Sequence, residues 1–329
     1  MARPRPWATC PEQALSAVRG VFTDIDDTLT CDGAVAPAAL AALHALHAAG
    51  VPVVAITGRP LGWSLPFARA WPVAAIVAEN GAVALIRHGE GVVTEYAQDE
   101  PTRSANAQRL RTVAQQVLTQ VPGARLATDS AGRETDIAID HSEFNALPAV
   151  AVAQAVALMQ AAGMTATVSS IHINGWFGDH TKLSAAHWMV RRLFGRDLQS
   201  EIDQWLFVGD STNDQLMFEA FPLSVGVANL MRFAPQLRHW PSYITTAERG
   251  EGFAQVVCSL LLALRSRLTQ PQPQMHTHTQ MQMQMQMQMQ TQTQTQRVQQ
   301  TQSVQQAQQT EQAQQTQQVQ QVQQVRRTL

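Results

Sequence analysis

Residues 21–30 read VFTDIDDTLT, an apolar run that favours a β-strand followed by three carboxylates. Strand side chains alternate between faces, so Asp24 and Asp26 point the same way for as long as strand geometry persists. At the C-terminal edge of a parallel sheet, both would reach the crevice where open α/β sheets bind ligands. An acidic turn, in which Asp26 and Asp27 cap a local bend, is the alternative explanation for the same residues.

Strands and helices alternate on either side of this run. Residues 19–26 are predicted as a buried strand, and the helix 37–49 has proline in its first turn and Gly50 just beyond its end. The other expected elements are strands at 51–56, 73–78, 205–208, 223–227 and 243–245, and helices at 65–70, 182–194, from about 213 and at 253–268. This alternation with short links predicts a parallel sheet covered on both faces.

Residues 83–176 break the alternation. The sequence there predicts strands at 83–87, 92–96, 136–140 and 165–174, and long helices at 105–120 and 148–162. This pattern is typical of an inserted α+β domain. We therefore expect a catalytic core of residues 15–86 and 178–268, with residues 87–177 as a cap.

The C-terminal segment, residues 269–329, is rich in glutamine and has low complexity. Residues 298–325 repeat with period three, which drifts by about 60° per repeat on an α-helix of 3.6 residues per turn. No lasting apolar face can form on such a helix. We expect this tail to be disordered, since it cannot bury a core.

The composition excludes several classes of protein. The formal net charge of −2 provides no basic face for nucleic acid, and no apolar run approaches the length of a membrane span. The three cysteines are scattered and have no metal-binding spacing, which favours a reducing, cytoplasmic setting. The oligomeric state is not indicated by the sequence.

Polar groups follow the predicted core strands or begin a core helix at four places. They are Asp24 with Asp26, the pair Thr57-Gly58, the chain's one lysine, Lys182, and the run GDSTND at 209–214. Each alone is more often a cap or a turn than a site. Their joint order on these elements indicates one site at the C-terminal edge of the sheet.

Phosphoryl transfer explains these residue types. Hydrolysis of a phosphate monoester is among the slowest uncatalysed reactions, and a carboxylate nucleophile divides it into two easier steps. Asp24 would attack phosphorus, while Asp26 would protonate the leaving alcohol and then deprotonate water. Lys182 and Mg²⁺ would neutralise the phosphate charge, with the Thr57 hydroxyl and nearby backbone N–H groups holding its oxygens.

The pattern resembles the haloacid dehalogenase-like (HAD) phosphatase superfamily over essentially the whole chain up to Leu268. The resemblance implies an α/β fold with a Rossmann-like parallel sheet core. It implies that Asp24 is the nucleophile and Asp26 the general acid/base, with Thr28 closing the first motif. It also implies phosphate binding by Thr57, Gly58 and Lys182, and Mg²⁺ held by the Asp24 carboxylate, the Asp26 carbonyl and Asp210, with Asp214 and Asn213 in support.

The spacing of these motifs indicates a branch of the superfamily. Thr57 follows Asp24 by 33 positions, too few for a cap, whereas Lys182 follows Thr57 by 125. About 90 of those residues can form a small domain. This arrangement resembles Cof-like, sucrose-phosphatase-like and mannosyl-3-phosphoglycerate-phosphatase-like members, although Asp27 stands where many of them have glycine. In such relatives the cap contacts the leaving group, for which the candidates here are Arg59, Glu79, Asn80, His172, Asn174 and Trp176.

The sequence thus predicts a Mg²⁺-dependent phosphomonoesterase acting on a small phosphorylated metabolite, with a sugar phosphate favoured because Trp176 lies beside His172 and Asn174. Packing of the tryptophan and histidine at a domain hinge is the alternative explanation for these residues. A phosphomutase of the phosphomannomutase type is the enzymatic alternative. A binding protein that keeps the fold without catalysis is the other, although a pure binder has no need of the full residue set.

Overall fold

The large sheet positions the site. The computed structural model describes residues 3–89, 91–269 and 286, and within them nine strands form one sheet in the order β1-β15-β14-β13-β2-β5-β6-β7-β8. In this order the first seven strands, β1 through β6, run parallel to one another. Strands β7 and β8 continue the sheet in antiparallel orientation. Their bounds, in sheet order, are Arg5–Pro6, Tyr243–Ile244, Leu223–Gly226, Trp205–Gly209, Gly20–Thr23, Val53–Ile56, Ala75–Ala78, Val83–His88 and Gly91–Tyr96.

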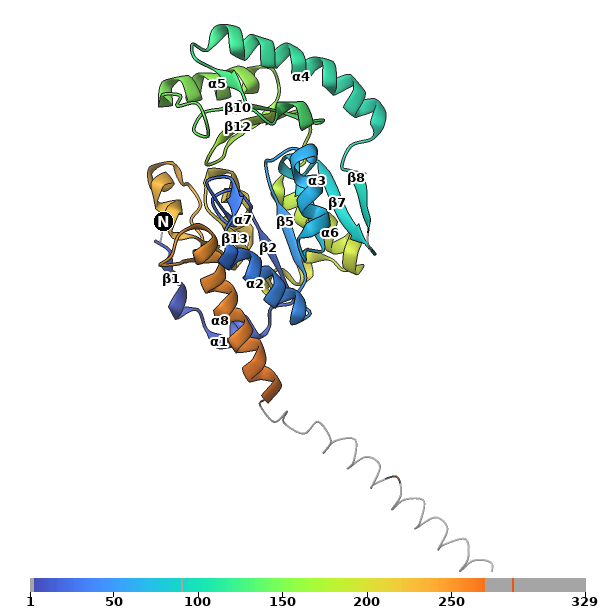
Figure 1. The fold of residues 1–329 in the computed structure, drawn as a ribbon, viewed down its shortest axis with the longest axis vertical. Helices are drawn as coiled ribbons and strands as arrows, with labels where there is room; N and C mark the ends of the chain where they lie inside the picture. The colour runs from blue at the N-terminus through green and yellow to red at the C-terminus, as the bar shows by residue number, and fades with distance from the viewer. Residues whose placement is uncertain (1–2, 90, 270–285, 287–329) are drawn as a thin grey trace, which may run out of the picture. The chain divides into compact units, whose positions relative to one another are not determined.

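Helices cover both faces of this sheet (Figure 1). Val21 and Val208 pack in a core with α2 and α8, whereas their neighbours Phe22 and Phe207 pack in a second core with α6 and α7. Because strand side chains alternate between the two faces, each of these strands contributes residues to two separate cores. The helix bounds are α1 Glu12–Ser16, α2 Pro37–Ala48, α3 Leu61–Ala70, α6 Lys182–Phe194, α7 Gln215–Ala220 and α8 Arg249–Thr269.

A second, four-stranded sheet lies in the insertion, in the order β11-β12-β10-β9. Its strands, Thr165–Val168, His172–Trp176, Asp136–Asp140 and Arg125–Leu126, pair antiparallel. Ile137, Ile139 and Ile173 pack against α4 (Glu100–Gln120) and α5 (Ala149–Ala161), the green helices of Figure 1. We call residues 99–177 the small lobe and the remaining described residues up to 269 the large lobe.

The other face of the small-lobe sheet is polar. Alternation along β10 and β12 places Asp136, Asp140, His172 and Asn174 on the face opposite the isoleucines. These four side chains are buried. Because burying unpaired polar groups is costly, this face needs partners, and one of them, the Gly58 carbonyl that accepts from Asn174, comes from the large lobe.

The expected α/β architecture with an α+β insertion is confirmed, with differences in detail. Residues 83–87 and 92–96, expected in the insertion, form β7 and β8 of the large sheet, so the sheet extends beyond the expected boundary at residue 87. Periodicity identifies a strand but not the sheet that it joins. The strand expected at 165–174 is two strands, α3 starts four residues early, and β1 was not anticipated. The tail, predicted to be disordered, lies outside the described residues except for Thr269 and Gln286.

Candidate active site

Asp24 lies directly after β2 and is 4% exposed. Its backbone N–H donates to the Val208 carbonyl at 2.9 Å, which continues the pairing of β2 with β13 by one residue. The strand itself ends at Thr23 rather than at residue 26. Strand alternation therefore does not set the direction of Asp26, and the contacts described below hold that residue in place.

Lys182 joins Asp24 to the loop after β13. Its ammonium donates to Asp24 Oδ1 at 2.5 Å and to Asp214 Oδ1 at 2.7 Å. Lys182 is the first residue of α6, which begins with a capping box between Thr181 and Ser184. This cap fixes the helix start, and with it the origin of the lysine side chain.

Asp214 holds the loop that follows β13. Its Oδ2 accepts hydrogen bonds from the backbone N–H groups of Asp210 at 3.0 Å and Ser211 at 3.3 Å. A Cβ at Gly209 would lie 2.4 Å from that oxygen, so the tight turn requires glycine there. Asn213 belongs to the same loop, and its Oδ1 accepts from Ser211 Oγ at 2.9 Å. Both Asp214 oxygens are thus already engaged.

Asp210 is different, because one of its oxygens is free. Asn229 Nδ2 donates to Asp210 Oδ2 at 3.2 Å and also to the Asp27 carbonyl at 3.0 Å. Asp210 Oδ1 is buried and has no hydrogen-bond partner among the described residues. A buried carboxylate oxygen without a hydrogen-bond partner is expected to bind a ligand.

Three carboxylates could hold a metal ion here. One oxygen from each of Asp24, Asp210 and Asp214 can be chosen such that all lie within 4.8 Å of one another. Carboxylate oxygens are the ligands that Mg²⁺ prefers. Asp210 has a free oxygen for such an ion, whereas both oxygens of Asp214 are already engaged.

Burial dominates the electrostatics of this cluster. It raises the pKa of Asp24 to about 8 even though the Lys182 ammonium acts in the opposite direction. Burial, followed by repulsion from Asp24 and Asp214, raises the pKa of Asp210 well above its ordinary value. Burial opposes the charge on Lys182, but the two carboxylates outweigh it and raise the lysine pKa. One ammonium therefore does not compensate the negative charge of three carboxylates. A bound cation would favour their charged forms.

Thr57 and Gly58 follow β5 at the same edge of the sheet. Thr57 Oγ1 accepts from the Arg59 N–H at 3.0 Å and lies 3.5 Å from Asp26 Oδ2. The Gly58 carbonyl accepts from Arg133 at 2.9 Å and from Asn174 at 3.4 Å, both in the small lobe. The predicted phosphate-binding loop is therefore held from both lobes.

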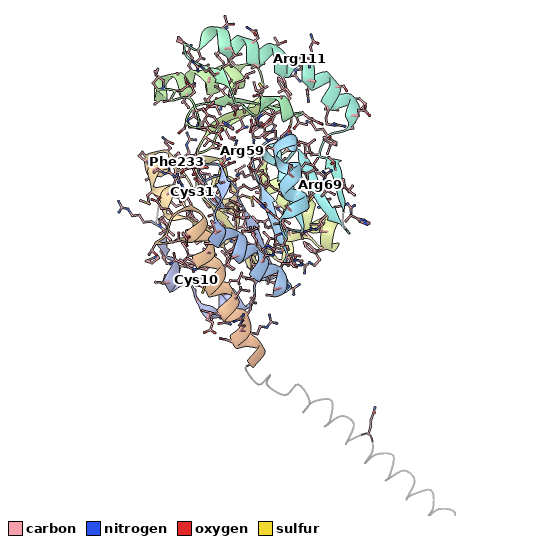
Figure 2. The ribbon with its side chains drawn as sticks, viewed as in Figure 1. Cys10, Cys31, Arg59, Arg69, Arg111 and Phe233 are labelled. Atoms are coloured by element: carbon pink, nitrogen blue, oxygen red, sulfur yellow. The ribbon has the colours of Figure 1, made fainter. Side chains whose placement is uncertain are left out.

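Arg59 binds the predicted general acid. Its Nε donates to Asp26 Oδ1 at 2.9 Å. Burial raises the pKa of Asp26, and the Arg59 guanidinium opposes that rise. Figure 2 labels Arg59 where the two lobes meet.

Glu79 and Asn80 lie beneath the small lobe in left-handed backbone conformations, with φ of 49° and 56°. The Glu79 carboxylate accepts from Thr135 N at 2.6 Å and from Leu61 N at 3.0 Å. Burial, then repulsion from Asp136, raises the pKa of Glu79 to about 7. Glu79 thus holds the small-lobe backbone.

The small-lobe candidates take three different positions. His172 Nε2 contacts Glu143 Oε2 at 2.9 Å, and Asn174 donates to Asp136 Oδ2 at 2.9 Å. Trp176 is buried, donates to the His180 carbonyl at 3.0 Å and stacks on the His180 ring. Trp176 therefore packs at the connection back to the large lobe.

A cavity of about 290 Å³ opens beside Asp26. Of the six candidate leaving-group residues, all of them described, Arg59 is the one that lines it. The large lobe also contributes Asp27, Arg232 and Arg249, and the small lobe contributes Glu143, Phe144 and Ile171. The cavity thus has a charged wall from one lobe and a partly apolar wall from the other.

Sequence reasoning missed Glu143, Asp129, Arg133 and Asn229. Asn229 follows β14 at the same sheet edge as the predicted site, so the strand-end rule that identified Asp210 could have found it. Glu143 follows the small-lobe strand β10 in a loop, and no spacing links it to Arg59, from which it is separated by 84 positions. Only the folded chain brings these two residues together.

The sequence model of the haloacid dehalogenase-like hydrolases matches residues 21–108, which include Asp24, Asp26 and Thr57. Over this segment the chain is similar to the haloacid dehalogenase-like hydrolases. The chain is 28% identical over 246 residues to a phosphoglycolate phosphatase of Methanothermobacter thermautotrophicus, an alignment that covers 73% of this chain and 97% of the relative. A phosphoglycolate phosphatase of Methanosarcina mazei is 24% identical over 73% of this chain and 95% of its own length. Together these matches indicate a hydrolase of the phosphatase type.

Solved structures agree on the haloacid dehalogenase-like fold. The sucrose-phosphatase of Synechocystis sp. PCC6803 superposes with a TM-score of 0.53 at 16% identity, over 74% of this chain and 98% of that one. A Thermoplasma acidophilum protein superposes with a TM-score of 0.56 at 15% identity, over 74% and 99%. Among the described residues, no helix is both long and apolar enough to cross a membrane.

Proposed function

We propose that this hydrolase is a Mg²⁺-dependent phosphomonoesterase that works through an aspartyl-phosphate intermediate on Asp24. The observation that carries the proposal is the buried contact of the Asp24 carboxylate with the Lys182 ammonium, beside the free oxygen of Asp210. A nucleophile, a fixed positive charge and a carboxylate oxygen able to bind a metal ion are the groups that attack on a phosphate dianion requires.

The two aspartates after β2 take different roles. Asp24 attacks phosphorus, and the Lys182 ammonium stabilises the charge that develops on the phosphoryl oxygens. Asp26 lies beside the cavity, where it gives a proton to the leaving alcohol and later takes one from the water that cleaves the acyl phosphate. Thr57 and the Gly58 backbone contribute hydrogen bonds to the phosphoryl group.

Asp24, the Asp26 carbonyl and Asp210 would hold Mg²⁺, with Asp214 and Asn213 fixing the loop around it. When bound, Mg²⁺ neutralises phosphate charge and polarises the phosphoryl oxygens. The raised pKa values of Asp24 and Asp210 support this assignment, because such a crowded set of carboxylates gains from an added cation.

The small lobe serves as the specificity cap, and the substrate is a small phosphorylated metabolite. A volume of about 290 Å³ lies at the lower end of ligand cavities, which favours a leaving group of a few carbons. A short sugar phosphate fits this volume, and phosphoglycolate is the natural comparison because both curated relatives are named for it.

The experiment is a phosphate-release screen of sugar phosphates, phosphoglycolate and phosphoglycerates with Mg²⁺, run on wild type and Asp24→Asn. We expect release from wild type and none above background from Asp24→Asn. Acid-quenched wild type should carry labelled phosphate on Asp24 by mass spectrometry. Wild-type turnover by Asp24→Asn would refute the mechanism, and isomerised sugar phosphate without phosphate release would identify a mutase.

A further inference from the structure

One guanidinium contacts carboxylates from both lobes. Arg59 Nε donates to Asp26 Oδ1 at 2.9 Å in the large lobe. Its Nη2 donates to Glu143 Oε1 at 2.7 Å, and its Nη1 to Asp129 Oδ2 at 3.2 Å, both in the small lobe. The Arg59 side chain is 5% exposed. A planar fork cannot turn toward one partner without moving relative to the others.

The geometry points to Arg59 and Glu143 as positioning residues that orient the Asp26 carboxylate for proton transfer when the small lobe is closed. Arg59 engages Asp26 Oδ1, whereas Oδ2 has a longer contact, 3.5 Å from Thr57 Oγ1, and is the oxygen that can protonate the leaving group. The inference rests on the proposed function, because it assigns Asp26 the role of general acid.

Glu143 is itself rigidly held. The Asp140 carboxylate accepts from the backbone N–H groups of Ser142, Glu143 and Phe144, at 3.1, 2.9 and 3.0 Å. His172 Nε2 contacts Glu143 Oε2 at 2.9 Å. Burial would raise the pKa of Glu143, but hydrogen bonds from His172 and Arg59 outweigh it and lower that pKa to about 2. Glu143 therefore stays ionised at neutral pH, as an anchor for Arg59 must.

Asp129 is anchored in a similar way. Arg133 donates to Asp129 Oδ1 at 3.1 Å and to both Asp136 oxygens at about 3 Å, and it also donates to the Gly58 carbonyl. Every anchor of the Arg59 fork on the small-lobe side thus belongs to a hydrogen-bonded network. Moving the small lobe away removes two of the three carboxylates that fix the guanidinium. Asp26 then loses its oriented partner, so proton transfer is coupled to closure.

The inference predicts a dependence on the leaving group. An alkyl alcohol needs a proton as it departs, whereas p-nitrophenolate is stable without one. General-acid catalysis contributes about 10²–10⁴-fold for a group that needs it. The ratio kcat/KM reports the steps through departure of the leaving group, so it isolates this proton from the later hydrolysis of the aspartyl phosphate.

The experiment compares kcat/KM for p-nitrophenyl phosphate with that for the best alkyl phosphate from the screen. For Arg59→Lys, which keeps the charge but not the fork, we expect a loss of about tenfold or more on the alkyl phosphate and less than about threefold on the aryl phosphate. Glu143→Gln should also lose more kcat/KM on the alkyl phosphate than on the aryl phosphate, but by a smaller margin. Retained aryl-phosphate turnover shows that each variant is folded.

Tyr96→Phe is the matched control, because it removes another hydrogen bond between the lobes, from Tyr96 Oη to Glu134 Oε2 at 2.7 Å. Tyr96→Phe should lower kcat/KM for the alkyl and the aryl phosphate by the same small factor. Equal losses on both substrates in Arg59→Lys, or no loss on either, would overturn the inference while leaving the phosphatase assignment intact. The phosphatase assignment fails separately, if the wild type releases no phosphate from any monoester.

Discussion

Lys182 Nζ lies 2.5 Å from Asp24 Oδ1, although the two residues are 158 positions apart in the sequence. The contact is buried, and the same ammonium also binds Asp214. Lys182 therefore connects the end of β2, the start of α6 and the loop after β13. Removing the lysine would leave a group of buried carboxylates without their shared counter-charge.

Lys182→Met should lower kcat by about 10²–10³-fold, the usual effect of removing one donor to a developing anion. Arg192→Met lies on the same helix but breaks only an exposed pair with Glu95, which contributes about 0–1 kcal/mol. Steady-state kinetics on both variants would test this. Comparable losses in the two would indicate that damage to α6, rather than charge at the site, explains the effect.

Asp210→Asn should weaken Mg²⁺ binding, because it replaces the carboxylate that has a free oxygen. Wild type should gain about 2.7 kcal/mol of stability when Mg²⁺ is at 100 times its Kd. The variant should gain much less at the same concentration, measured as the shift in Tm between EDTA and Mg²⁺. The exposed Asp203→Asn serves as control and should keep the full shift. An undiminished shift in Asp210→Asn would exclude Asp210 as a ligand.

Glu79 should make stability fall with rising pH. Its folded-state pKa of about 7 lies above the ordinary glutamate value, because burial and Asp136 disfavour its charge. Between about pH 4.3 and 7 the folded state keeps a proton that the unfolded state has lost, so stability is full below this window and declines through it. Urea unfolding of wild type and Glu79→Gln at pH 5 and 8 measures this decline. The wild type should lose on the order of 2–3 kcal/mol relative to the variant; an unchanged difference contradicts the prediction.

Gly209→Ala should disturb the site from within the backbone. Its Cβ would lie 2.4 Å from Asp214 Oδ2, and the aspartate that holds Lys182 would have to move. A displacement of about 1 Å at such a position can cost about 10²-fold in rate. Gly91→Ala is the control, since the nearest contact of its Cβ among the described residues is the His88 carbonyl at 3.6 Å. Equal kcat in the two alanine variants would show that the loop tolerates the shift.

The sequence predicted the alternating core well because its strands carry a strong signal. Strands β5, β6 and β13 are continuous apolar runs that end in polar residues, and this pattern can be recognised without tertiary information. Asp24 and Asp210 follow from it, because the carboxyl ends of parallel strands share one edge. Lys182 stands at the start of a predicted core helix, and the structure brings it into direct contact with Asp24.

The contacts between the lobes could not be predicted in the same way. Glu143 and Arg59 meet through a loop whose position depends on how the small-lobe sheet lies over the large one, which no local periodicity encodes. Trp176 was a candidate either for contact with a sugar or for packing at a domain hinge, and the sequence does not separate the two. In the structure it is buried and packs on His180, at the connection back to the large lobe.

Lys182 is the one lysine in the sequence, and its side chain is almost fully buried. Reagents that acylate primary amines will therefore find a single ε-amine, and it lies at the centre of the site. Its rate of labelling can report how often the enzyme admits solvent and reagent. The chain thus carries a built-in chemical probe of its own opening, without any engineered tag.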